Sequence, residues 1–271
     1  MIMSDHKQPI IQTAFFASFP ILLLLILDFF ALFLQTENKA IPHLAVAVLS
    51  AQLICILVFI KGQICPGQRS RLAKVNLAPL LFWGIWFLTS LFSNYHFALT
   101  DMICLMGIGL VIATNAQAED KKALRAGLMM AAFIGILAGL SYLIIFFELS
   151  LEQYLPYNIF AQILVGIILA NIFLVVSKNR LQAFIDLLPF AMISLLFINA
   201  LSSLLLLASQ ASNPLFINPL ALILYFALHL IIALILAIHI FKKWKLGFIT
   251  LLILLFMAAS LPIWSLLAKV H

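Results

Sequence analysis

The sequence predicts an all-α protein, a polytopic transmembrane bundle of about nine helices with a cytoplasmic N-terminus and a C-terminus outside. The mean hydropathy is +1.22. Only 9% of the 271 residues are charged, whereas about a quarter are charged in soluble domains. The apolar runs are long and continuous, which favours helices, because strands of a membrane barrel alternate and have about ten residues.

Nine apolar runs approach the length of about 20 residues that a helix needs to cross a bilayer core. We expect spans at about 13–35, 43–60, 77–94, 97–115, 126–147, 159–177, 184–208, 215–241 and 246–268. Together they make residues 1–271 one integral membrane domain, without a soluble domain. The first run is longer than the apolar part of a signal peptide and lacks an A-x-A cleavage site, so we expect it to remain as a helix.

Short polar segments end each span in turn. The first four spans are separated by "TENKAIPH", by the basic stretch "KGQICPGQRSRLAKVN" at 61–76 and by "SNYHF". The later spans are separated by "NAQAEDKK", "SLEQYLPYN", "SKNR", "SQASNP" and "FKKWK". Asn, Ser, Pro and Lys are concentrated in these segments, which is typical of turns and membrane-surface loops.

The basic residues fix the orientation of the bundle. With the N-terminus inside, all but two of the 15 Lys and Arg residues fall on the cytoplasmic side; the exceptions are Lys39 and Lys269. Cytoplasmic loops of membrane proteins carry this excess. We therefore interpret the stretch 61–76 as an orientation signal. A functional anion site there is the alternative, and attraction to anionic lipid is compatible with both.

Two acids and a histidine lie near the outer ends of the predicted spans. Asp28 and Asp101 are expected about 6–10 Å below the outer surface, on the first and fourth spans, with His96, Glu148 and Glu152 above them. An ionisable group within a span indicates function by default. These residues could form an acidic mouth for a cation or a proton; alternatively, each aspartate forms a hydrogen bond to a neighbouring helix or faces interfacial water.

Three polar residues are expected at one depth near the middle of the membrane: Asn171, Asn199 and His229, on the sixth, seventh and eighth spans. They could form a buried cluster. A proton relay is one interpretation, and interhelical packing, with about 0.6 kcal/mol per contact, is the other.

Gly135 and Gly139 form a G-x-x-x-G pattern, which allows two helices to approach closely. Packing within this chain is the simplest interpretation.

Motifs for catalysis or cofactor binding do not occur in the sequence. H-E-x-x-H, G-x-S-x-G, the phosphate-binding loop, the dinucleotide fingerprint and zinc-type cysteine spacing are all missing. We expect no cofactor and no metal site, and the sequence favours a non-enzymatic role without deciding it. The expected partners are the lipid bilayer and other membrane proteins. The net charge of +6 requires no nucleic acid, because the positive-inside pattern accounts for it.

Two stretches, "LLFWGIWFLTSLFSNYHFALTD" and "YNIFAQILVGIILANIF", resemble the first half of the O-antigen ligase and polymerase group. That resemblance covers about a third of the chain. It implies a multi-span bundle that handles lipid-linked glycan. The large outward loop with catalytic His and Arg residues, which is typical of the group, has no counterpart here, so a shortened relative is implied.

Three hypotheses for function follow from the sequence. The first is a non-enzymatic accessory or scaffold protein of the bacterial inner membrane, acting in maintenance of the cell envelope. The second is a transporter of a small cation, a proton-coupled solute or an amphiphile, with Asp28, Asp101 and His229 as the principal residues. The third is the handling of lipid-linked glycan that the resemblance implies.

Overall fold

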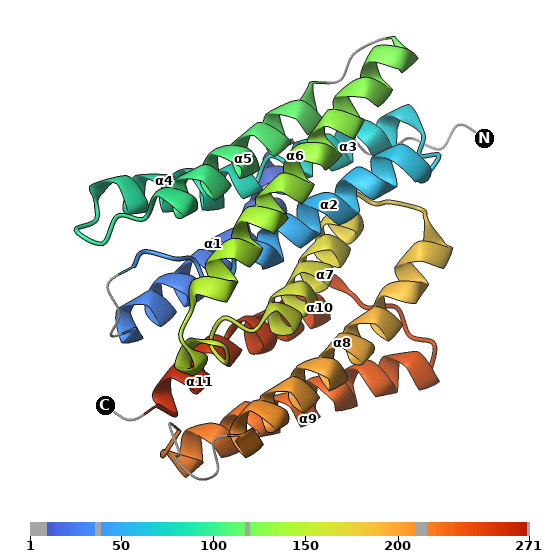
Figure 1. The fold of residues 1–271 in the computed structure, drawn as a ribbon. Coiled ribbons are helices and arrows are strands. Elements are labelled where there is room, and N and C mark those ends of the chain that lie inside the picture. Colours follow the sequence, from blue (N-terminus) through green and yellow to red (C-terminus); the bar gives the residue numbers. More distant parts are fainter. Residues whose placement is uncertain (1–9, 36–38, 117–119, 210–215, 270–271) are drawn as a thin grey trace.

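The computed structural model describes residues 10–35, 39–116, 120–209 and 216–269, and the regular elements in these ranges are helices (Figure 1). They are α1 (Ile10–Leu34), α2 (Ala45–Lys61), α3 (Pro66–Val75), α4 (Pro79–Phe92), α5 (Ala98–Asn115), α6 (Lys121–Glu148), the 3-10 turn η1 (Leu151–Gln153), α7 (Ile159–Val176), α8 (Gln182–Ser209), α9 (Pro219–Phe241), α10 (Phe248–Ala259) and α11 (Leu261–Leu267). The predicted all-α class is confirmed.

The described residues include eight helical segments that are long and apolar enough to span a membrane. Two of them combine consecutive helices: Pro66–Phe92 contains α3 and α4, and Phe248–Leu267 contains α10 and α11. α2, with 17 residues, is the ninth apolar helix and falls just short of that length. The count of about nine is therefore close to what the structure contains.

Connections that we predicted for the same side of the membrane lie together. In Figure 1 the α2–α3, α7–α8 and α9–α10 connections lie at one end of the bundle, and the α1–α2 and α4–α5 connections lie at the other. Arg71 Nε donates to the Ser177 carbonyl (3.0 Å) at the first end. The Ala40 N–H donates to the Tyr95 carbonyl (2.9 Å) at the second end. α2 therefore runs from one end to the other, as a ninth crossing requires.

The basic stretch 61–76 differs from its prediction as a loop, because most of it is helix α3. Pro66 occupies the first turn, where its missing N–H costs nothing. Gln68 Oε1 accepts the Cys65 N–H (3.4 Å) as half of a capping box. Leu72 and Val75 are buried in the bundle, so an apolar face anchors this short helix.

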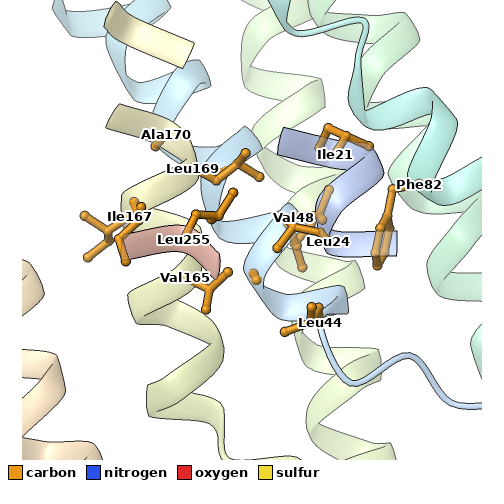
Figure 2. Close-up of a cluster of buried hydrophobic side chains, with 14 of the residues drawn as sticks. Ile21, Leu24, Leu44, Val48, Phe82, Val165, Ile167, Leu169, Ala170 and Leu255 are labelled. Carbon is orange, nitrogen blue, oxygen red and sulfur yellow. The ribbon is translucent and has the colours of Figure 1, made fainter. Parts of the chain in front are cut away.

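α2 and α7 form the centre of the bundle. In α7, 72% of the span residues are buried, the largest share among the eight segments. Val48 on α2, Val165 and Leu169 on α7, and Leu255 on α10 pack into one apolar cluster (Figure 2). Gly166 permits the contact, because a Cβ there would lie 2.6 Å from the Ala47 carbonyl oxygen.

The G-x-x-x-G pattern contributes to packing within the chain. A Cβ at Gly135 on α6 would lie 2.5 Å from Leu53 Cδ2 on α2, and a Cβ at Gly139 would lie 3.8 Å from Leu49 Cδ2. Gly135 therefore makes the close approach, and Gly139 has ordinary van der Waals room.

Candidate functional site

The outer end of the bundle contains a carboxylate and an imidazole that are both fully buried. Asp28 lies on α1, about 9 Å below the outer end of that helix at a rise of 1.5 Å per residue. Its Oδ1 accepts the backbone N–H of His43 (2.8 Å) and lies 3.6 Å from Nδ1 of the His43 ring, and both side chains are 0% exposed. Burying an ionisable pair in a membrane bundle is costly, which makes the pair a candidate site.

Several polar atoms around this pair form no hydrogen bond within the described part of the chain. They are Asp28 Oδ2, both ring nitrogens of His43 and Trp86 Nε1, although the side chains of His43 and Trp86 both interact with the Asp28 carboxylate. Trp86 lies close to Asp28, and its ring stacks on Phe29 at a centroid distance of 5.1 Å, which joins α4 to α1. Most buried polar groups in proteins are paired, so this concentration of available donors and acceptors distinguishes the site.

A second acid–histidine pair lies above the buried one, at the outer rim. His96 Nε2 and Asp101 Oδ2 are 2.6 Å apart, with side chains 48% and 15% exposed. His96 and Asp101 thus form an acid–histidine pair near the surface, and Asp28 lies deeper in the bundle.

The predicted acidic mouth therefore takes a different form from the one we expected. Asp101 and His96 do lie at the rim, but Asp28 is enclosed below them and is not open to the outside. Glu148, which we expected above the two aspartates, is instead 3.8 Å from Lys39. The alternative prediction for Asp28, a hydrogen bond to a neighbouring helix, also differs from the structure, because Asp28 accepts from His43, which lies in the connection before α2.

The segment that holds His43 is fixed by a network from α6 and α7. Gln162 Oε1 accepts the Val46 N–H (3.0 Å), and Gln162 Nε2 donates to the Tyr142 hydroxyl (2.8 Å). The Tyr157 ring stacks on the His43 ring at 4.1 Å and 14°, and its hydroxyl donates to the Ile41 carbonyl (3.1 Å). The imidazole is therefore held in one orientation beside Asp28.

The predicted cluster near the middle of the membrane is only partly assembled. Asn199 Nδ2 lies 2.8 Å from His229 Nε2, and His229 Nδ1 lies 2.8 Å from the Tyr225 carbonyl oxygen. Because that carbonyl only accepts, Nδ1 carries the proton and Nε2 accepts from Asn199, which makes His229 neutral. The Ser203 and Tyr225 hydroxyls, 2.9 Å apart, extend the same network. Both nitrogens of His229 are thus engaged: Nε2 joins α9 to α8, and Nδ1 contacts a carbonyl of α9 itself.

Asn171 does not take part in that network. It is fully buried on α7, and neither atom of its amide has a hydrogen-bond partner among the described residues. Asn76, which follows α3, is also fully buried, and its amide likewise has no hydrogen-bond partner in the described ranges. Gln52 on α2 accepts the indole N–H of Trp83 (2.8 Å), while its Nε2 has no partner in the described ranges. Buried polar groups therefore occur at several depths of the central helices.

Sequence analysis missed His43, Trp86 and the residues that fix them. His43 was counted as the first residue of the second span, within the polar segment "TENKAIPH". One available signal was Asp28, because a lone acid within an apolar run requires a partner. Sequence spacing alone does not show that the partner is His43, since it approaches from the connection between helices.

The comparisons with known proteins agree with this architecture. A protein of Haemophilus influenzae is 46% identical to this chain over 264 residues, which are 97% of this chain and 98% of that protein. Its name, Uncharacterized protein, assigns no activity. No solved structure matches the chain. A family described as an integral membrane domain matches residues 7–267, and the chain therefore belongs to that family of integral membrane proteins.

Proposed function

We propose that this integral membrane protein moves protons or a small cation across the bacterial inner membrane, with Asp28 and His43 as the central site. The observation that carries the proposal is the fully buried carboxylate–imidazole pair, in which Asp28 Oδ2 and both ring nitrogens of His43 form no hydrogen bond in the described structure. An aspartate and a histidine are the side chains that proton relays in membrane pumps and transporters commonly use.

The surroundings of the pair fit this role. From the outside, His96 and Asp101 provide a half-exposed acid–base pair through which a cation or a proton enters. Further toward the predicted cytoplasmic end, the buried amides of Gln52, Asn171 and Asn76 have atoms without a hydrogen-bond partner in the described ranges. Polar side chains that face the interior of a bundle commonly mark such pathways.

The test is ion flux in proteoliposomes that contain a pH-sensitive dye. A proton gradient, and then gradients of Na⁺ and K⁺, are applied across vesicles with the wild-type protein and across protein-free vesicles. We expect flux of at least one of these ions above the protein-free level. Equal rates in both kinds of vesicle for all three ions contradict the proposal.

His43→Phe provides the matched variant. Phenylalanine keeps an aromatic ring to stack on Tyr157 and keeps the backbone N–H that bonds Asp28, but it lacks the ring nitrogens. We expect the flux to fall at least about tenfold, because general acid–base groups typically contribute about 10²–10⁴-fold to proton transfer. Wild-type flux in this variant would remove His43 from the pathway.

The second candidate function is an accessory or scaffold role in maintenance of the cell envelope, and the faces of α8 and α9 favour it. Only 22% and 28% of their span residues are buried, against 72% for α7. The Asn199–His229 contact joins the two helices into a pair. Their wide apolar faces offer a surface for another membrane protein as well as for lipid.

Photo-crosslinking in cells shows whether these faces contact another membrane protein or only lipid. A photoreactive residue is placed at Leu205 on α8 or at Leu230 on α9, which are 63% and 72% exposed, and at Phe133 on α6 (57% exposed) as a control. A discrete protein adduct from α8 and α9, but not from α6, supports the scaffold role. Adducts with lipid alone from all three positions contradict it.

The handling of lipid-linked glycan, which the resemblance implies, stays a prediction, and no contact described above favours it. Altered surface glycan in a deletion strain would support that role, and unchanged glycan would argue against it.

A further inference from the structure

A basic pocket lies at the predicted cytoplasmic end of the bundle, where α2 ends and α3 and α6 begin. Its volume is about 520 Å³, and Lys61, Arg69 and Arg125 contribute cations to it from these three helices. Ile60 and Leu128 contribute apolar walls. The pocket thus combines cationic and apolar walls. The boundary between the headgroups and the acyl chains of a bilayer has the same combination of charged and apolar groups.

Arg69 is positioned in this pocket before any ligand binds. Its Nη2 donates to the Phe59 carbonyl (3.3 Å), and its guanidinium lies 6.0 Å from the centroid of the Phe59 ring. Its Nη1 is buried and has no hydrogen-bond partner among the described residues. A guanidinium fixed beside two further cations suits a phosphate, which arginine binds through charged N–H donors.

The charge of the pocket is uncompensated within the described chain. Among the described residues no acidic side chain lines the pocket, and the ion pairs found in these ranges do not involve its three cations. Asp120, close by in the sequence, is used as the cap of α6, where its Oδ2 accepts the Ala123 N–H (3.0 Å). The positive end of the α6 dipole adds to the attraction for an anion.

We propose that this pocket binds the phosphate of an anionic phospholipid from the cytoplasmic leaflet. Arg69 and Arg125 contact the phosphate oxygens, Lys61 contributes charge, and the acyl chains extend along Ile60 and Leu128 into the bilayer. Sequence analysis left open an anion site in the stretch 61–76; the structure adds Arg125, which comes from a distant part of the chain. The site is independent of the Asp28 pathway.

The test is native mass spectrometry of the purified protein with added phosphatidylglycerol or phosphatidylcholine. We expect the phosphatidylglycerol adduct to predominate. Arg69→Gln and Arg125→Gln should each reduce it at least about tenfold, which corresponds to the loss of one charged hydrogen bond of about 1.5 kcal/mol. Lys74→Gln is the charge-matched control, because Lys74 is exposed on α3 and lies outside the residues that line the pocket. This variant should bind like the wild type.

Two different results would overturn the proposal, one with lipids and one with inorganic phosphate. Equal adducts with both lipids, or adducts that survive both arginine substitutions, show that the pocket does not select the anionic lipid. Inorganic phosphate forms the second arm, measured by the thermal stability of the protein in detergent. Stabilisation by phosphate that Arg125→Gln abolishes, without a selective lipid adduct, would assign the pocket to a soluble phosphate instead. Arg125 is exposed, so its replacement does not endanger folding.

Discussion

Two histidines illustrate how surroundings decide the role of a residue type. His43 has ring nitrogens without partners among the described residues and lies beside a buried carboxylate. His229 has both nitrogens engaged, one with Asn199 and one with the Tyr225 carbonyl. The first is placed to exchange a proton or to bind a cation, whereas the second holds two helices together.

We therefore expect His229→Leu to affect stability and not transport. Leucine is apolar and loses both hydrogen bonds, and interhelical contacts of this kind contribute about 0.6 kcal/mol and at most about 2 kcal/mol. Thermal unfolding in detergent should show a modest decrease in midpoint, with ion flux within about twofold of the wild-type rate. A loss of flux as large as that expected for His43→Phe would make His229 part of the pathway.

Sequence reasoning identified Asp28 as a significant residue but not its partner. The predicted depth of Asp28 followed from helix geometry, which is regular, and the burial of an acid follows from its place in an apolar run. The contact with His43 depends on how the connection 39–44 folds back onto α1. That path is fixed by Gln162 on α7 and by Tyr157 in the connection before α7, both distant in the sequence, so local sequence carries no signal of it.

At the scale of helices, the ends of the elements were easier to predict than their contacts. Polar segments interrupt the apolar runs, and most helix ends fall within a few residues of the predicted boundaries. Helices commonly end at a glycine in the left-handed conformation, which helps to locate the end in a sequence. After α7 and α9 this conformation is adopted by Lys178 and Lys243, with φ of 51° and 52°, so no glycine marks these two ends. Hydrogen bonds to the last carbonyls of each helix support these turns.

The close packing of α2 and α7 leads to a prediction about glycine. Gly166→Ala should lower the stability by about 1–3 kcal/mol, because the new Cβ would lie 2.6 Å from both the Ala47 carbonyl oxygen and Ser50 Cβ. Gly84→Ala is the control, since no atom lies within 4 Å of a Cβ there. The control should be neutral or stabilising by about 0.5–1 kcal/mol, as alanine is the better helix former. Equal effects on the midpoint of thermal unfolding would mean that α2 and α7 pack less closely than described.

At the scale of the whole molecule, the account depends on the orientation of the bundle. The basic connections lie at one end (Figure 1). The Asp28 site lies near the other, because Asp28 is close to the end of α1 and contacts His43 in the α1–α2 connection. Composition and charge were sufficient to predict this arrangement, because the cost of moving cations across a bilayer acts on the loops and not on details of packing.

The native cysteines make the orientation testable. Cys65 is exposed at the predicted cytoplasmic end, whereas Cys55 and Cys104 are buried. A membrane-impermeant maleimide should therefore leave the wild-type protein unlabelled in right-side-out membranes and label it after permeabilisation. Asn94→Cys, in the exposed connection between α4 and α5, should be labelled without permeabilisation. The reverse pattern would invert the bundle and place the Asp28 site at the cytoplasmic side.

The most direct test of the proposed pathway is the ion flux of Asp28→Asn in proteoliposomes. Asparagine keeps an oxygen that can accept the His43 N–H, so the fold around the site should persist, but it can neither carry a negative charge nor exchange a proton at this position. We predict flux near the protein-free level, while Asp186→Asn, at an exposed aspartate of α8, retains the wild-type rate. Wild-type flux in Asp28→Asn would contradict the account.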